Sequence, residues 1–425
     1  MTYYARKLSS KPRRSGSSSE VERKLPKLDV AGSIPVSRSI FYFQRITSSA
    51  TRLLLLGFLG ACGGPQLAQQ SPLDTPDNHY RRGLAYFDRG DMITAQREFE
   101  RARLLDSDYP GALVGIALVA MERGEFWRAR KDVTTAIHRN ADFVDAHIAL
   151  GRIATAEGVE RDYATEEWLE EATDAYERAE KRQPDYPATY YYRGHSHLLA
   201  LDLVGAREAF TRVLDIDRGP LVARAMAAAE RIQMIERAAP GTRAGLKIAL
   251  ISEISRGELA VLLVEEMQLP LLVSQRPVSL RPGGFRPPGA VQVEAPAPVD
   301  IDKSWAAPWI AEVIDLGVTG MELYPDQTFR PSSPITRADY ARVVQGVLIL
   351  LTGDSELATK YVGETSRFPD VRSDFYGYNA IALSTERGIM SAEKVSGLFR
   401  PEQPVSGAEA LLMMRELQSV FRREF

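Results

Sequence analysis

The 425-residue chain has a single cysteine, Cys62, which excludes an internal disulfide framework and a zinc site built on several thiolates. No run of 18 or more apolar residues occurs, so no membrane-spanning helix is expected. The phosphate-binding motif GxxxxGK[ST] and the nucleophile motif GxSxG are both absent. Of the five histidines, His195 and His197 are close in sequence, but residues two apart on a helix point in different directions. The sequence therefore predicts no metal site, no cofactor and no enzymatic activity.

The net charge of −3 is unevenly distributed. Residues 1–60 contain eleven Lys or Arg and three Asp or Glu, which leaves the rest of the chain at −11. An acidic body repels a phosphate backbone, so nucleic acid is not expected as a partner. A hydrophobic content of 44% and a charged content of 26% are typical of a folded globular protein, and the length suffices for two or three domains.

The N-terminal part has the composition of a leader. Residues 1–35 are rich in Ser, Lys, Arg and Pro, and we expect them to be disordered. One hypothesis is that they are an untranslated extension and that translation starts near Val36. Residues 36–61 then have the order of a signal peptide, with arginines first, the apolar run 53–61 next and small residues at its end.

Leu59-Gly-Ala-Cys62 resembles the lipobox of bacterial lipoproteins. In that family the signal is cut before the cysteine, whose thiol is diacylated and whose new amino terminus is acylated. The resemblance implies a membrane anchor at Cys62 and a flexible tether over residues 62–75, and several acyl chains hold a protein more firmly than one. The alternative is that Cys62 is an ordinary buried cysteine behind a hydrophobic helix.

A period of 34 residues runs through residues 76–238. The residues that recur at this interval include Gly90, Gly124 and Gly158, Ala95 and Ala129, and Ala172 and Ala206, and nine extra residues follow Gly158. Small residues and glycines at these positions resemble the tetratricopeptide repeat (TPR). The resemblance implies units over 76–109, 110–143, 144–186 and 187–220, followed by a capping helix. Stacked helix pairs form a solenoid whose concave groove implies a protein partner. The alternative is that the array is only a spacer.

Three helix starts in the C-terminal part resemble one another. They are Ile254-Ser-Arg-Gly-Glu258, Ile335-Thr-Arg-Ala-Asp339 and Val405-Ser-Gly-Ala-Glu409. Each places Ser or Thr three residues before Glu or Asp, which predicts a capping box. Phe329-Arg-Pro331 and Phe399-Arg-Pro401 precede the second and third starts at the same distance.

These segments resemble S-layer homology (SLH) modules, which pack in threes into an α-helical bundle. Full modules are expected over 300–352 and 368–425, a partial module over 239–268, and a Pro-rich linker over 269–299. In that family the bundle binds cell-wall polysaccharide through the arginine at the helix start and nearby aromatic residues.

Arg337 with Trp305 or Trp309 is the first candidate binding site, and Arg256 is the second. An arginine at the first helical position lies beside free backbone N–H groups and can bind a carboxylate through two hydrogen bonds. An indole ring supplies an apolar face for a sugar. Gly407 stands where the third module would have its arginine, so at most two sites are expected. The alternative is that the helix starts are only caps and that the bundle is a packing domain.

Together these features predict a mostly α-helical protein, a TPR solenoid followed by an SLH-type bundle of three modules. We expect a non-enzymatic lipoprotein adaptor of the bacterial cell envelope, anchored in the outer membrane and facing the periplasm. Its array would bind a protein partner, and its bundle would bind cell-wall polysaccharide or peptidoglycan. The alternative is an assembly or secretion-machinery lipoprotein of the outer membrane with a structural bundle. A third hypothesis is an accessory protein or regulator of a hydrolase.

Overall fold

The computed structural model describes residues 71–275 and 298–424. Within these ranges the secondary structure is helical, and only isolated β-bridges pair extended residues. The predicted fold class, mostly α, is confirmed. The helices in these ranges are all too short or too polar to cross a membrane. Cys62, the predicted leader and most of the predicted tether and linker lie outside the described residues.

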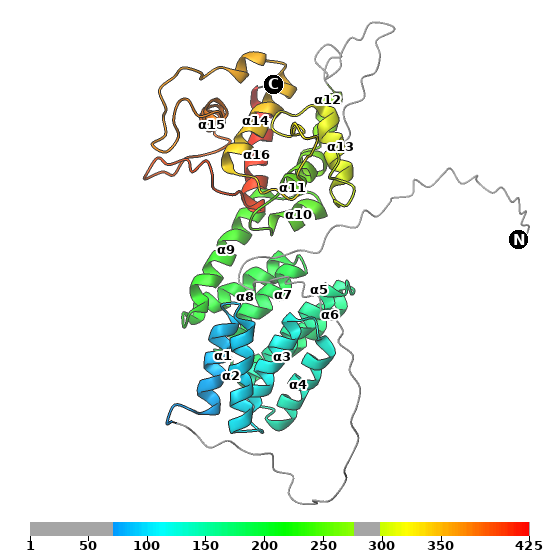
Figure 1. Cartoon of the computed structure of the whole chain (residues 1–425), viewed down its shortest axis with the longest axis vertical. Helices are drawn as coiled ribbons and strands as arrows, with labels where there is room; N and C mark the ends of the chain where they lie inside the picture. The colour runs from blue at the N-terminus through cyan, green and yellow to red at the C-terminus, as the bar shows by residue number, and fades with distance from the viewer. Residues whose placement is uncertain (1–70, 276–297, 425) are drawn as a thin grey trace, which may run out of the picture.

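The first eight helices form four consecutive pairs (Figure 1). Their bounds are α1 Pro76–Phe87, α2 Met92–Leu105, α3 Pro110–Glu122, α4 Phe126–Arg139, α5 Val144–Glu160, α6 Thr165–Arg182, α7 Pro187–Leu199 and α8 Leu203–Ile216. The nine extra residues of the third unit mostly lengthen its helices. α5 has 17 residues where α3 has 13, and α6 has 18 where α4 has 14. The insertion therefore adds about one turn to each helix of that pair.

Phe99 shows why small residues recur where the helices cross. Its side chain is fully buried on α2. A Cβ atom at Gly83 of α1 would lie 2.4 Å from the Phe99 ring, and one at Gly115 of α3 would lie 2.1 Å from it. Both contacts are far shorter than van der Waals distance, so only glycine lets α1 and α3 approach this ring.

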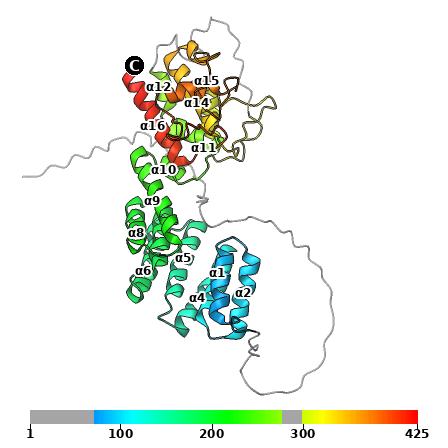
Figure 2. The same cartoon turned by 90° about the vertical axis from the view of Figure 1, so that its left-hand side faces the viewer.

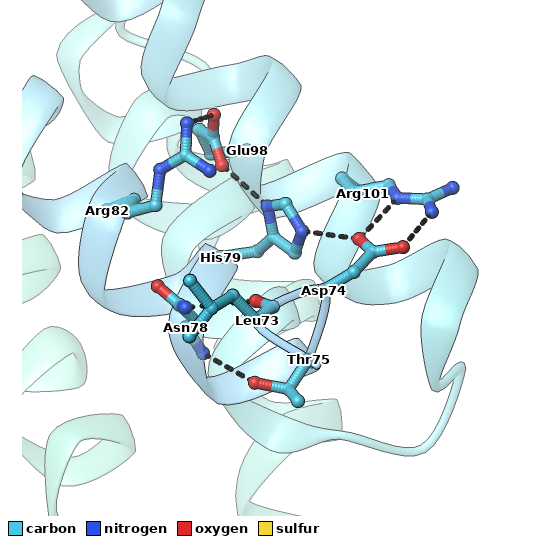
Figure 3. A network of polar contacts seen from close by, with 8 residues as sticks. All are labelled: Leu73, Asp74, Thr75, Asn78, His79, Arg82, Glu98 and Arg101. Carbon is cyan, nitrogen blue, oxygen red and sulfur yellow. Dashed lines mark hydrogen bonds and ion pairs between the residues drawn. The ribbon is translucent and has the colours of Figure 1, made fainter. Parts of the chain in front are cut away.

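A polar network attaches the residues before α1 to α2 (Figure 3). His79 is 9% exposed, and its two ring nitrogens lie 2.7 Å from Asp74 Oδ1 and 2.6 Å from Glu98 Oε2. Arg101 also pairs with Asp74, and Arg82 lies 3.0 Å from Glu98. These contacts join both helices of the first pair and fix the start of the array.

The fourth helix pair and the C-terminal bundle share one hydrophobic core, whereas the first three pairs have buried clusters of their own. Helix α9, Leu221–Ala238, follows α8 and extends toward α16, Gly407–Glu424 (Figures 1 and 2). The core is continuous from Tyr190 of the fourth pair to Val420 of α16. Arg415 of α16 donates hydrogen bonds of 2.7 Å to the carbonyls of Ala238 and Ala239, at the end of α9.

The bundle is built from short helices and turns. Their bounds are α10 Arg243–Ala249, α11 Arg256–Val261, the π-helical turn η1 Leu262–Glu266, α12 Leu269–Ser274, α13 Ala307–Leu316, α14 Arg337–Thr352, the 3₁₀ turn η3 Ser355–Ala358 and α15 Tyr378–Glu386. Helices α11, α14 and α16 begin at the three similar sequences. The starts of α11 and α14 position the candidate arginines Arg256 and Arg337.

Candidate functional site

A closed ring of backbone hydrogen bonds joins the three helix starts. Ile254 N donates to Val405 O at 2.9 Å, Val405 N donates to Ile335 O at 3.0 Å, and Ile335 N donates to Ile254 O at 2.9 Å. Each module thus donates one bond and accepts one. The ring gives the bundle a threefold arrangement around these residues.

The predicted capping boxes are confirmed at all three starts. Ser255 with Glu258 caps α11, and Thr336 with Asp339 caps α14. At α16, Ser406 N donates to Glu409 Oε2 at 3.1 Å and Glu409 N donates to Ser406 Oγ at 3.3 Å. Each box satisfies amide groups that have no partner within the helix, so the residue after the cap is held in a defined position.

Asp300 and Asp370 stabilise the Phe-Arg-Pro turns. Asp300 accepts 2.7 Å hydrogen bonds from the amides of Phe329 and Arg330, and Asp370 does the same for Phe399 and Arg400 at 2.9 and 2.7 Å. The two arginines have φ values of +59° and +58°, in a region that residues other than glycine rarely adopt. The sequence signal for this role is that Asp370 follows Asp300 by the same 70 residues by which Phe399 follows Phe329.

Arg256 is a buried link between the partial module and module 300–352. Its side chain is 7% exposed, and its nitrogens donate to the carbonyls of Phe329, Gly320 and Glu322 at 2.9, 2.9 and 3.0 Å. Burial lowers the pKa of the guanidinium from its usual value. All three nitrogens already have acceptors, so Arg256 contributes mainly to the contact between modules.

Arg337 occupies the equivalent position toward module 368–425 but is only half-buried. Nε donates to Phe399 O at 2.8 Å, and Nη2 donates to Ser391 O at 2.7 Å. The aromatic ring that lies over its guanidinium is Phe399, with its centroid 4.7 Å from Cζ. Within residues 71–275 and 298–424, Nη1 has no acceptor. Arg337 therefore keeps a donor group for a ligand.

The two candidate tryptophans lie at the start of α13. Trp309 is 3% exposed, and its Nε1 donates to Glu265 Oε1 of η1 at 2.7 Å. Trp305 is half-buried and meets Trp309 edge to face, with 5.7 Å between the ring centroids. Trp305 is thus the more accessible of the two, and its role in binding stays a prediction.

Sequence reasoning missed two tyrosine–arginine pairs on the two full modules, in which Arg330 and Tyr376 are exposed and Tyr324 and Arg342 are half-buried. Arg330 Cζ lies 4.0 Å from the ring centroid of Tyr324, and Arg342 Cζ lies 5.6 Å from that of Tyr376. Tyr376 is 69% exposed. Aromatic faces beside guanidinium groups suit a sugar that carries an acidic substituent. The sequence signals were the position of Arg330 within its Phe-Arg-Pro motif and the position of Tyr376 shortly after Asp370.

Gly407 cannot be replaced by the arginine that the other modules have. A Cβ atom at Gly407 would lie 1.7 Å from the carbonyl oxygen of Ile248, at the end of α10. This helix takes the place that a Phe-Arg-Pro turn has in the other two modules. An arginine at Gly407 therefore does not fit unless α10 and α16 move apart.

Lipidation of Cys62 stays a prediction, because the residue lies outside the described ranges. Within those ranges, no group of three or more His, Cys, Asp or Glu side chains has an arrangement that could hold a metal ion.

Comparison with known families supports the modules of the bundle. The family model of the S-layer homology domain matches residues 299–341 and 367–411. These segments include Trp305, Trp309 and Arg337, and they contain both Phe-Arg-Pro turns with their aspartates. No curated protein matches the chain.

Among solved structures, a thermophilic TPR protein from Thermus thermophilus is similar to part of the chain. The sequence identity is 19% and the TM-score is 0.34. The match covers 46% of this chain and 93% of that protein.

Proposed function

We propose that the protein is a non-enzymatic adaptor of the bacterial cell envelope. Its bundle binds an acidic cell-wall polysaccharide or peptidoglycan, and its helical array binds a protein partner. Acylated Cys62 anchors it in the outer membrane, with the folded part in the periplasm. The match of both full modules to the S-layer homology domain carries this proposal.

The chemistry of the bundle agrees with an acidic polymer. Arg337 lies at the first position of the sixteen-residue helix α14, where the helix dipole favours an anion. Its free Nη1 can donate to a carboxylate, and the exposed ring of Tyr376 offers a sugar an apolar face.

One observation favours a second candidate, an outer-membrane assembly or secretion lipoprotein with a structural bundle. Arg256 and Arg337 together donate five hydrogen bonds to backbone carbonyls of the following modules. Arginines used in this way hold modules together without any ligand. Co-sedimentation of the protein with purified cell wall separates the two candidates.

Arg337→Ala should weaken binding to purified cell wall by about tenfold to a hundredfold, because a charge-assisted hydrogen bond contributes roughly 1.5–3 kcal/mol. Arg337→Lys should recover part of the affinity, since an ammonium group lacks the planar fork. The matched control is Arg372→Ala, which removes an exposed arginine of module 368–425. Thermal unfolding checks that each variant is folded. Equal sedimentation of wild type and folded Arg337→Ala would favour the structural bundle.

Cys62→Ser should leave the protein without acyl chains and move it from the membrane fraction to the soluble fraction. The anchor depends on the thiol, and serine offers the lipid-transfer step no equivalent group. Fractionation followed by mass spectrometry of the N-terminal peptide measures both effects. Continued membrane association of the serine variant would show that another part of the chain holds it there.

A further inference from the structure

A buried arginine without a hydrogen-bond acceptor lies inside the helical array. Arg152 of α5 is 9% exposed. Its Cζ lies 4.2 Å from the ring centroid of Tyr192 on α7 and 5.3 Å from that of Phe87 on α1. Across the described residues, its guanidinium forms no hydrogen bond and no ion pair, and it contacts these two rings. Three of the four helix pairs thus converge on one cation.

Ring contacts leave the donors of Arg152 unused. The five N–H groups of a guanidinium point outward in its plane, whereas a cation–π contact acts through the face of the ring. Arg152 as a residue is largely buried, and a hydrogen bond from its guanidinium to a carboxylate is stronger in such surroundings than in water. The arrangement therefore suits an acceptor that comes from outside the chain.

Further basic side chains surround this position. His195 of α7 has a buried Nε2 that lacks a hydrogen-bond partner among the described residues. Burial, together with the charges of Arg152, Arg231 and Arg224, lowers the pKa of His195 to about 4. The imidazole is therefore neutral at pH 7, and the positive charge here comes from the three arginines. Arg224 and Arg231 belong to α9, so the capping helix contributes to the same region.

Two carboxylates face this region, and neither neutralises Arg152. Glu122, at the end of α3, is half-buried; burial raises its pKa, and Arg152 partly opposes that rise. It forms no ion pair with Arg152 within 4.0 Å in the described part of the chain. Asp88 lies 4.0 Å from Arg224, at the limit of an ion pair. Three arginines against two carboxylates leave an excess of positive charge.

We infer that this inner face of the array binds a carboxylate from an acidic segment of a partner protein, with Arg152 as the anchoring cation. The inference rests on the proposed role of the array in protein binding and specifies the chemistry of the partner. A carboxylate can accept two parallel N–H bonds from the guanidinium edge. The flanking rings of Phe87 and Tyr192 keep water away and strengthen these bonds.

Hexaglutamate labelled with fluorescein tests the inference by fluorescence anisotropy with the full chain at low ionic strength. Wild type should bind hexaglutamate and leave hexaglutamine unbound. Arg152→Gln should weaken binding tenfold or more, because both charge-assisted bonds are lost. Glu122→Gln should strengthen binding, because it removes a nearby negative charge. The matched control is Arg178→Gln on α6, an exposed arginine whose loss should leave affinity unchanged.

Circular dichroism establishes whether each variant is folded. If Arg152→Gln fails to fold, Arg152→Lys is the test variant. Lysine keeps the positive charge but lacks the planar pair of N–H donors, so the affinity for hexaglutamate should fall severalfold. Two outcomes would overturn the inference: no binding of hexaglutamate by wild type, or equal binding by wild type and the folded Arg152 variants. Cell-wall sedimentation tests the proposed function of the bundle separately from peptide binding by the array. Arg152→Gln should sediment with the wall as wild type does.

Discussion

Gly407→Arg should unfold or strongly destabilise the C-terminal bundle and should add no polymer-binding site. The new Cβ atom would lie 1.7 Å from Ile248 O, so α10 and α16 have to separate before any side chain fits. Overpacking typically costs about 1–3 kcal/mol, and a clash with backbone at this distance should cost about 3 kcal/mol or more. Thermal unfolding followed by circular dichroism measures the effect.

Two alanine variants show how much of this loss of stability comes from the new Cβ atom alone. Gly407→Ala introduces the clashing atom without the long side chain, so it should lose nearly as much stability as Gly407→Arg. Gly257→Ala is the matched control in α11, where the nearest atom, Pro331 O, would lie 3.1 Å from the new Cβ. A small shift relieves that contact, and the loss should be slight. An unchanged melting temperature for Gly407→Arg, with stronger wall binding, would show that α10 moves aside.

Arg256→Met should lower the free energy of unfolding by about 3 kcal/mol or more. Methionine keeps much of the apolar volume but leaves the carbonyls of Phe329, Gly320 and Glu322 without their donor. Leaving a buried polar group unsatisfied costs about 1–3 kcal/mol. Urea unfolding of the full chain measures the change.

Arg337→Met is the comparison for that variant. Arg337 makes two such hydrogen bonds and is half-buried, so the loss should be smaller. Arg330→Met removes an exposed arginine of the same bundle and should change stability little. If Arg256→Met unfolded like wild type yet no longer bound the wall, ligand binding rather than module contact would be the role of Arg256.

The features that the sequence predicted well are local ones. The 34-residue period follows from glycines and alanines that each helix crossing requires, as the packing of Gly83 against Phe99 and of Gly151 against Tyr176 shows. The capping boxes depend on side chains three residues apart. Such patterns can be recognised without knowing which distant segments come together.

The roles of the arginines depend on distant partners, and the sequence could not predict them. Arg256 donates to carbonyls that lie 64 to 73 residues further along the chain. Arg152 meets rings from the first and fourth helix pairs, Phe87 and Tyr192, which are far apart in the sequence. Backbone acceptors also have no signature in the sequence, since every residue carries a carbonyl group.

The ring formed by Ile254, Ile335 and Val405 sets the order in which the chain can fold. Val405 is separated from Ile254 by about 150 residues. The ring can therefore close, at the entropy cost of a long loop, only after the final module is available. Until then the bundle-facing side of α9 has no α16 to cover it, although α9 already follows the repeats. Contacts this remote slow folding. During synthesis the helical array can therefore fold first, whereas the bundle completes its fold only after α16 has been made.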